Sequence, residues 1–433
     1  MGRSITRDVK NLTAPRGTYD ILPDDSRRWQ ALEAVIDGVC ARYCYGEIRT
    51  PLFESTDVFV RTIGEGTDIV DKEMYTFIDR GGRSITLRPE LTAPVVRAVL
   101  EHSMLQTLPL KLYYRGPFFR YERPQRGRFR QAHQVGVECF GTAAPEADAE
   151  VIALALDVVG GAGIRDRHLE LNSIGCPTCR AVYRKALVEY FEKNSATLSE
   201  LSRARLTTNP LRILDSKDEA DLRLVATAPR VLDYLCAECR AHFEGVKSSL
   251  RSMHIDFAIN PNIVRGLDYY TRTVFEITSP ALGAQSAVAG GGRYDGLVES
   301  MGGPPTPGVG FGMGMDRLIL AAHAEGSSNS DERQLDVAFV ALETAGLAAL
   351  VPALHAMRTA GFRADVDYTL RKMDKQLKNA AARGARLAVI VGSDELSAGE
   401  ATIQNLDTRE RSRVALAHVE GEVVRRLQQR EKA

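Results

Sequence analysis

The distribution of apolar positions predicts a chain of mixed helices and strands. Trp29, Leu32, Ile36 and Val39 repeat at helical spacing after the helix-starting run Pro23–Ser26. The segment PEADAEVIALALDVVGGAG is typical of a helix closed by glycines. Short strand patterns occur in SITLRP, LKLYYR, TVFEIT and VGFGMG. Because these elements alternate irregularly, without repeated βαβ units, they predict an α+β core built on a mostly antiparallel sheet.

Two later segments depart from this pattern. From about Cys176 to Met253 the sequence is charged, helix-forming and poor in strand patterns, which predicts a helical insertion. The polar run HAEGSSNSDERQ predicts a linker. After it, strand and helix patterns alternate as in a compact α/β domain. The expected segments are a core formed by residues 1–170 and 254–325, an insertion at 171–253, a linker at 326–334 and an α/β domain at 335–433.

The composition is that of a soluble globular protein with two or three domains. The chain has 433 residues, of which 44% are hydrophobic and 26% charged. Lys plus Arg and Asp plus Glu both total 56, so any binding of nucleic acid must use local patches. The N-terminal segment lacks the apolar core of a secretory signal, and no run approaches the ~18 apolar residues of a membrane helix. Seven cysteines in such a chain favour reduced thiols and a cytoplasmic location.

One local concentration of charge interrupts this neutral background. The segment FFRYERPQRGRFRQAHQVGVECFG places five arginines between Arg120 and Arg130 and then becomes apolar around a single Glu138. Alternation predicts a hairpin in this region. Its expected parts are a strand over LKLYYRGPFFRYE, a turn over RPQRG and a returning strand over RFRQAHQVGVECF.

Alternation also assigns the side chains of this hairpin to two faces. Arg120 and Glu122 share a face of the first strand. Gln134 and Glu138 share a face of the second strand, where small neighbours leave empty volume between the polar groups. Phe129 falls on the opposite face with the apolar residues, which predicts a position in the core.

The hairpin is predicted to form the floor of an anion-binding pocket. Arginine suits phosphate because its planar fork bonds two oxygens at once and keeps its charge. A solvated, arginine-rich hairpin is the alternative. However, an unpaired carboxylate such as Glu138 among apolar strand residues is costly, and it requires a cationic or N–H-bearing partner.

Three further stretches offer polar groups to the same pocket. TLRPELTAP contributes Glu90 and Thr92, which share a face if the segment is extended, and VRGLDYYTRTVFEI places Tyr269 and Tyr270 before a strand. The glycines of TPGVGFGMGMDRL strip one strand face of side chains, so that a flat ring could lie against it. Arg317 follows in the first turn of a helix, where the helix end also favours anions. Each stretch also has a purely structural explanation, respectively an ion pair, a core tyrosine and close backbone packing.

The order of these motifs resembles that of bacterial histidyl-tRNA synthetases, a family of class II aminoacyl-tRNA synthetases. The matching motifs are RTPLFE, LRPELTAP, FRYERPQRGRFRQAHQVGVE, RGLDYYTRTVFE, AGGGRYDGL and GFGMGMDRL, and they span nearly the whole chain. The resemblance implies a class II antiparallel sheet core with a helical insertion. It places motifs 1 and 2 in residues 1–170, and the histidine motifs and motif 3 in 254–325. It makes the C-terminal α/β domain an anticodon-binding domain.

The resemblance also implies an ATP-dependent histidine–tRNA ligase. Such an enzyme activates histidine to histidyl-adenylate and transfers it to the 3′ end of tRNA(His), with Mg²⁺ accompanying ATP. Arg120 would contact the α-phosphate, with Glu122 beside it, and Arg317 would hold the γ-phosphate. Phe129 would lie near the adenine, contrary to the core position that alternation predicts.

The implied histidine site draws on the hairpin, on TLRPELTAP and on VRGLDYYTRTVFEI. Within it Glu90, Thr92 and Gln134 would hold the amino group. Glu138 and the tyrosine pair would read the imidazole, because a carboxylate can accept a ring N–H, and such readout discriminates by roughly 10⁴ or more against an analogue lacking the group. Arg265 and Arg120 would be the catalytic arginines. Of the two, Arg265 would be placed where other class II enzymes hold a metal ion. The full implied set is Glu90, Thr92, Arg120, Gln134, Glu138, Arg265, Tyr269 and Tyr270.

Partners follow from the same resemblance. Arg123 and Gln125, on the turn, would meet the acceptor end of the tRNA. The N-terminal helix and the Pro51 strand correspond to a dimer-forming motif and imply a homodimer. One alternative is a regulatory paralogue of histidine biosynthesis that binds histidine without aminoacylation. The arginine-rich turn and the full C-terminal domain argue against it. A synthetase for threonine, proline or glycine is the other alternative, against which RGLDYY and Glu138 argue.

Two cysteine pairs, CPTC and CAEC, lie in the predicted insertion. Each pair has the local spacing of zinc ligands. The 56 residues from 180 to 235 that separate them exceed a zinc ribbon, but they could form a helical excursion that returns to one site. Reduced structural thiols are the favoured interpretation, with a structural zinc as the alternative. The residues concerned are Cys176, Cys179, Cys236 and Cys239.

Overall fold

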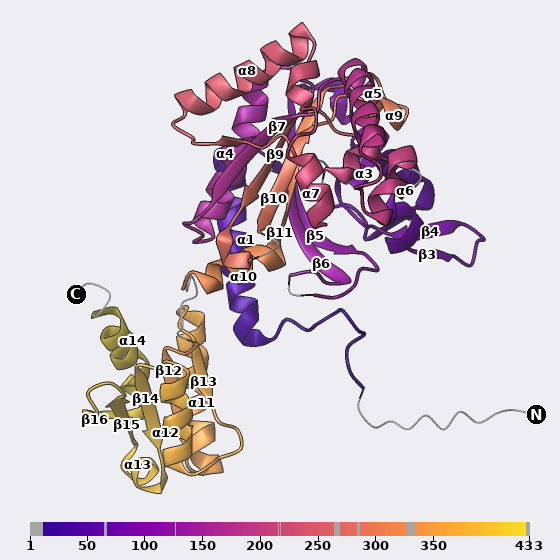
Figure 1. Cartoon of the computed structure of the whole chain (residues 1–433). Coiled ribbons are helices and arrows are strands. Elements are labelled where there is room, and N and C mark those ends of the chain that lie inside the picture. The colour runs from indigo at the N-terminus through magenta and orange to yellow at the C-terminus, as the bar shows by residue number, and fades with distance from the viewer. Residues whose placement is uncertain are drawn as a thin grey trace, which may run out of the picture. The chain divides into compact units, whose positions relative to one another are not determined.

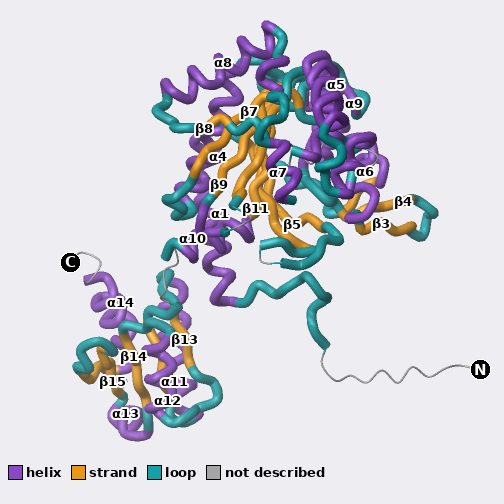
Figure 2. The backbone as a smooth tube through the Cα atoms, viewed as in Figure 1, coloured by secondary structure: helices purple, strands orange, loops and turns teal. Residues whose placement is uncertain are grey.

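The computed structural model separates into two compact units, Met1–Asn329 and Ser330–Ala433. Figures 1 and 2 trace the backbone of both. The structure describes residues 12–64, 67–125, 127–214, 216, 218–263, 269–283, 286–326 and 334–429. Most of the expected linker at 326–334 therefore lies outside the described residues. Across the described residues, every helix is too short or too polar to cross a membrane.

The larger unit is built on a broad sheet, which confirms the predicted antiparallel core. Its described strands lie in the order β1-β5-β6-β11-β10-β9-β7-β8, with parallel pairing at the two ends and antiparallel pairing between them. The strands are β1 (Gly46–Glu47), β5 (Leu110–Phe119), β6 (Gln131–Phe140), β7 (His168–Ser173), β8 (Ala258–Ile259), β9 (Thr271–Thr278), β10 (Ala287–Arg293) and β11 (Gly308–Gly314).

The two faces of this sheet meet different surroundings. On one face, Val135 and Val137 of β6 join Phe311 of β11 in the main apolar core. Helices α1 (Pro23–Arg42), α4 (Pro145–Gly161), α8 (Ala237–Ser252) and α10 (Met315–Ala324) complete that core. On the other face, α3 (Thr92–Glu101) and α9 (Leu297–Ser300) cover a smaller cluster. The polar residues Gln134 and Glu138 belong to this second face, as alternation predicts.

A small antiparallel sheet and a group of helices complete the larger unit. The small sheet has the order β2-β4-β3 and packs beside α2. The predicted insertion contains helices with an apolar cluster of their own. Figure 2 shows these helices in purple. The elements are β2 (Phe53–Ser55), β3 (Tyr75–Ile78), β4 (Ser84–Leu87), α2 (Thr56–Ile63), α5 (Pro177–Lys193), α6 (Glu200–Thr208) and α7 (Glu219–Val225).

The smaller unit is an α/β domain, as its strand and helix patterns predict. Its sheet has the order β13-β12-β14-β15-β16, parallel from β13 to β14 and antiparallel beyond. Its strands are β12 (Val337–Ala341), β13 (Ala364–Val366), β14 (Leu387–Val391), β15 (Glu400–Asn405) and β16 (Arg411–Ala415). Its helices are α11 (Thr344–Thr359), α12 (Met373–Ala382), α13 (Ser393–Ala398) and α14 (Val419–Gln429).

Candidate active site

The arginine-rich hairpin has shorter strands than predicted. β5 ends at Phe119 and β6 begins at Gln131, so the connection spans residues 120–130 and not a five-residue turn. The expected strands are too long because part of this loop bonds to another segment. The backbone N–H of Tyr121, for example, donates to the carbonyl of Glu73 (2.7 Å).

The predicted core position of Phe129 is wrong. This residue precedes β6, so strand alternation does not apply to it. Its side chain lines a cavity, and its ring packs against Tyr19 with a centroid separation of 4.7 Å. The N–H of Arg130 also donates to the carbonyl of Gly17 (2.7 Å). The N-terminal segment therefore supports the loop at its return to β6.

That cavity has a volume of about 330 Å³ and lies over the polar face of β6 and β11. Polar groups from four separated stretches of sequence converge on it, as predicted. The predicted site residues that line it are Glu90, Thr92, Arg120, Glu122, Phe129, Gln134, Tyr269, Tyr270 and Arg317. Their individual roles remain predictions.

The rim of the cavity, which we define as Arg120, Glu122, Arg128 and Arg317, carries an excess of positive charge. Glu122 lies between two arginines, with oxygens 3.8 Å from Arg120 and 3.5 Å from Arg128. Arg120 is oriented by its Nε, which donates to the carbonyl of Pro89 (2.8 Å). Burial, and then the neighbouring charge of Arg128, lower the pKa of Arg317. Three cations around one carboxylate suit an anionic ligand.

Glu90 caps a helix, so the shared face that an extended segment would give to Glu90 and Thr92 does not arise. Its carboxylate accepts the backbone N–H groups of Thr92 (2.6 Å) and Ala93 (2.7 Å) at the start of α3. Burial raises the pKa of Glu90, while these two N–H donors and Arg120 oppose that rise. The cap fixes Glu90 and Thr92 at the cavity wall, because an N-terminal carboxylate satisfies otherwise unpaired helix N–H groups.

Glu138 lies behind the described wall of the cavity and is only 1% exposed. Its carboxylate accepts hydrogen bonds from the hydroxyls of Tyr114 (2.9 Å) and Tyr294. We call these three residues the floor. The space predicted to be empty beside Gly136 is filled by Tyr114. Its hydroxyl would lie 2.3 Å from a Cβ at that position. A Cβ at Gly310 would likewise lie 2.1 Å from the Glu138 carboxylate.

Burial gives the floor an unusual acid–base character. It raises the pKa of Glu138 to about 8, although the hydroxyls of Tyr294, Thr92 and Tyr114 oppose the rise. At neutral pH the carboxyl group is therefore largely protonated in the free protein. A ligand N–H that donates to it would favour the ionised form.

The tyrosine pair closes one side of the cavity. The Tyr269 ring lies 4.8 Å from that of Tyr270 and 5.8 Å from that of Tyr294, measured between centroids. Burial raises the pKa of Tyr269, so its hydroxyl stays protonated. Arg265 lies outside the described residues.

The two residues predicted to meet tRNA are placed differently from the cavity residues. Arg123 and Gln125 are exposed on the loop between β5 and β6. Gln125 forms an isolated bridge with Arg128, which belongs to the rim. A ligand that contacts this loop would therefore lie beside the rim of the cavity.

Comparison with known families accounts for both units. The family model described as Histidyl-tRNA synthetase matches residues 17–318. The chain belongs to the histidyl-tRNA synthetase family. The model described as Anticodon binding domain matches residues 350–426 of this synthetase-family chain.

Curated relatives and solved structures agree with this assignment. Histidine–tRNA ligase from Desulforudis audaxviator is 52% identical over 96% of this chain and 98% of the relative. That from Pelotomaculum thermopropionicum is 50% identical over 93% and 95%. The crystal structure of apo S. aureus histidyl-tRNA synthetase is 38% identical, with a TM-score of 0.79, over 95% of this chain and 100% of that one. The predicted family and fold class are thus confirmed.

The sequence patterns do not predict four supporting residues of this synthetase-family site. Tyr114 and Tyr294 form the floor with Glu138. Tyr19 donates to Asp316, whose second oxygen accepts the backbone N–H of His133 (2.7 Å). The signal for Tyr114 was the small Gly136 opposite it, and Tyr294 belongs to the AGGGRYDGL motif. We find no sequence signal for the Tyr19–Asp316 contact, because 297 positions separate its partners.

Proposed function

We propose that this protein is a histidine–tRNA ligase. It activates L-histidine with ATP to form histidyl-adenylate and pyrophosphate, and then transfers histidine to the 3′ end of tRNA(His). The observation that carries the proposal is one cavity that joins an arginine-rich rim to carboxyl, amide and tyrosine groups. Such a cavity can hold a nucleotide phosphate beside an amino acid.

In the first step the rim binds ATP, which enters as its Mg²⁺ complex. Arg120 contacts the α-phosphate and Arg317 the γ-phosphate, while Glu122 lies beside Arg120 and Phe129 packs near the adenine. The histidine carboxylate attacks the α-phosphorus, and pyrophosphate leaves. No side-chain nucleophile is required, so the protein accelerates this step by positioning the reactants and stabilising phosphoryl charge.

The cavity wall and the floor hold the amino acid. Glu90, Thr92 and Gln134 bind the amino group. Glu138, with Tyr269 and Tyr270, binds the imidazole. A carboxylate oxygen has two lone pairs, so Glu138 can accept a ring N–H while its tyrosine hydrogen bonds persist.

Arg265 completes the proposed catalytic set. It supplies a fixed charge at the reaction centre, and the tyrosine pair follows it in the sequence. Arg265→His should therefore fold normally but lose adenylation. Adenylation near the wild-type rate would contradict this role.

The second step brings tRNA to the same cavity. Arg123 and Gln125 contact the acceptor end, and the C-terminal domain binds the anticodon. We propose the division into a catalytic core at 1–170 and 254–325, an insertion at 171–253, a linker at 326–334 and an anticodon-binding domain at 335–433. A homodimer and a cytoplasmic location belong to the same proposal and rest on the sequence resemblance and the cysteine content.

The test is histidine-dependent exchange of pyrophosphate into ATP, measured alongside charging of tRNA(His). Exchange and charging together would support the ligase. Histidine binding without either would favour the regulatory paralogue. Exchange that depends on another amino acid would show that the assignment of the pocket around Glu138 is wrong.

A further inference from the structure

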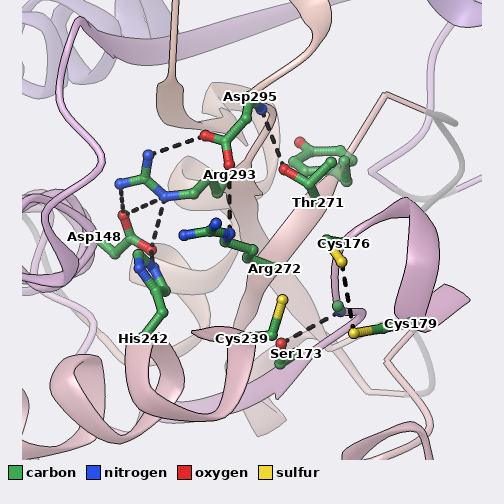
Figure 3. Close-up of polar contacts among 12 residues, drawn as sticks. Asp148, Ser173, Cys176, Cys179, Cys239, His242, Thr271, Arg272, Arg293 and Asp295 are labelled. Atoms are coloured by element: carbon green, nitrogen blue, oxygen red, sulfur yellow. Dashed lines mark hydrogen bonds and ion pairs between the residues drawn. The ribbon is translucent and has the colours of Figure 1, made fainter. Parts of the chain in front are cut away.

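Four cysteine sulfurs converge at one point of the larger unit. Their Sγ atoms all lie within 4.8 Å of one another, although the two pairs are far apart in sequence. Cys176 and Cys179 are separated by 3.6 Å between sulfurs. Figure 3 shows these two and Cys239 pointing toward a common centre. Four thiolates about 2.3 Å from a tetrahedral zinc ion lie about 3.8 Å apart, so the spacing fits one ion.

The two pairs are presented in the same way. Cys176 occupies the N-cap of α5 and Cys236 the N-cap of α8, and the second cysteine of each pair lies in the first helical turn. The backbone N–H of Cys236 donates to the sulfur of Cys179 (3.1 Å), and that of Cys239 to the sulfur of Cys236 (3.5 Å). Helix N-termini and N–H donors directed at sulfur stabilise thiolates, the form that binds metal.

The turn before the first pair is shaped around the sulfurs. Gly175 has a φ of +67°, and a Cβ there would lie 2.5 Å from the Cβ of Cys179. Cys179 and Cys239 are 2% and 1% exposed, so the cluster has a protected side. Two independent dithiol pairs would not need to bring all four sulfurs together in this way.

We propose that Cys176, Cys179, Cys236 and Cys239 bind one zinc ion as a tetrathiolate. Binding replaces the thiol protons, which pass to solvent, and it requires no oxidant or reductant. The two pairs lie at the starts of α5 and α8, with α6 and α7 between them in the sequence, so the ion joins the points where the helical insertion leaves and rejoins the rest of the unit. We call this junction the neck. The site is structural and does not depend on the proposed ligase activity.

The neck also contacts the wall of the candidate active site. Arg180, one residue after Cys179, donates to the backbone carbonyl of Tyr270, which lines the cavity. The N–H of Arg272 donates to the carbonyl of Gly175 (2.9 Å). The zinc site therefore fixes the segment that carries Tyr269 and Tyr270.

A buried polar network joins the same neck to the core. His242, one turn after Cys239 on α8, contacts Asp148 of α4 at 2.7 Å. Asp148 also accepts a hydrogen bond from Arg293 of β10 (3.0 Å). Figure 3 shows this network beside the cysteines. A zinc ion would thus link the start of α8 to α5, while His242 links the same helix to the sheet.

The experiment measures zinc in untagged protein purified under reducing conditions. Elemental analysis should give one zinc per chain. Cys176→Ser and Cys239→Ser should lose it, whereas Cys44→Ser, an exposed thiol outside the cluster, should retain it. Cobalt substitution should give the strong visible bands of a tetrahedral ion together with a thiolate-to-cobalt charge-transfer band.

Two measurements on the unmutated protein test for the zinc site even if the cluster variants do not fold. An organomercurial that titrates the four cluster thiols should release the zinc stoichiometrically. Wild-type protein that holds free thiols but no zinc, and that gives no tetrahedral cobalt spectrum, would overturn the proposal. Equal loss of zinc from Cys44→Ser would also overturn it.

Discussion

The floor and the rim of the cavity differ in how deeply their charged groups are buried and in how closely those groups are paired. In the floor, a buried carboxyl group is surrounded by tyrosine hydroxyls and is 1% exposed. In the rim, the Arg120 and Arg128 side chains are 23% and 49% exposed, and they contact Glu122 only at 3.8 and 3.5 Å. Long, partly hydrated ion pairs are weak, so an incoming phosphate can replace them at little cost. A buried group whose two oxygens already accept hydrogen bonds is held in one orientation, which suits the recognition of one specific ligand.

The largest effect should come from breaking the rim. Arg120→Gln should slow histidine-dependent pyrophosphate exchange by about 10²–10³-fold, because it removes a charged donor from the site of phosphoryl charge. The measurement is the exchange rate at saturating histidine. Arg115→Gln is a matched control, since Arg115 lies on β5, the strand that leads into Arg120, but pairs with Asp37 (2.6 Å). Similar losses in both variants would contradict the assignment.

A substitution in the floor should weaken the binding of histidine and leave the binding of ATP unchanged. Glu138→Gln should raise the KM for histidine about 10- to 100-fold, since hydrogen bonds to charged groups contribute ~1.5–3 kcal/mol. The KM for ATP should stay near its wild-type value. Steady-state exchange kinetics with each substrate varied in turn would separate the two. A parallel rise in both constants would mean that Glu138 supports the whole cavity and does not read the ring.

Removing one donor from the floor should have a smaller effect. Tyr294→Phe should raise the KM for histidine by about 2- to 10-fold, as expected for one hydrogen bond of ~0.5–1.5 kcal/mol. It should also raise the pKa of Glu138 further, because the Tyr294 hydroxyl opposes the effect of burial. Tyr113→Phe is the control, because that hydroxyl donates to Asp37 (3.0 Å). An equal rise in the KM for histidine in Tyr113→Phe would show that the effect is not specific to the sheet face that carries Glu138.

The regular strands explain how much of this contrast the sequence could predict. Alternation placed Gln134 and Glu138 on one face of β6, because that strand is regular from Gln131 to Phe140. It failed at Phe129, which lies in a loop supported by the N-terminal segment, and it does not apply to Glu90, which caps a helix. Local periodicity carries no information about such tertiary contacts.

The sequence does not predict the tyrosine partners of Glu138 in the floor, for a related reason. Its hydroxyl donors come from β5 and from the residue after β10, and they meet Glu138 only when the sheet is assembled. The cysteine cluster is similar, since the spacing within each pair is local but their convergence depends on how the insertion folds. Residue types and motifs indicated which groups matter, whereas their partners required the structure.

The pKa of Glu138 allows the floor to be tested by pH. Because burial raises that pKa from 4.5 to about 8, the folded protein holds this proton more tightly than the unfolded chain. The contribution of Glu138 to stability should therefore fall as pH rises from 4.5 to about 8. Histidine that donates a ring N–H requires the ionised form, so its affinity should increase with pH up to about 8.

The most direct test of the account is the number of protons released when histidine binds near pH 7. Isothermal titration calorimetry in two buffers of different ionisation enthalpy measures this number. Wild-type protein should release a proton, and Glu138→Gln, which cannot ionise, should abolish that release. Identical proton counts for the two proteins would contradict the claim that the buried carboxyl group of the floor recognises histidine.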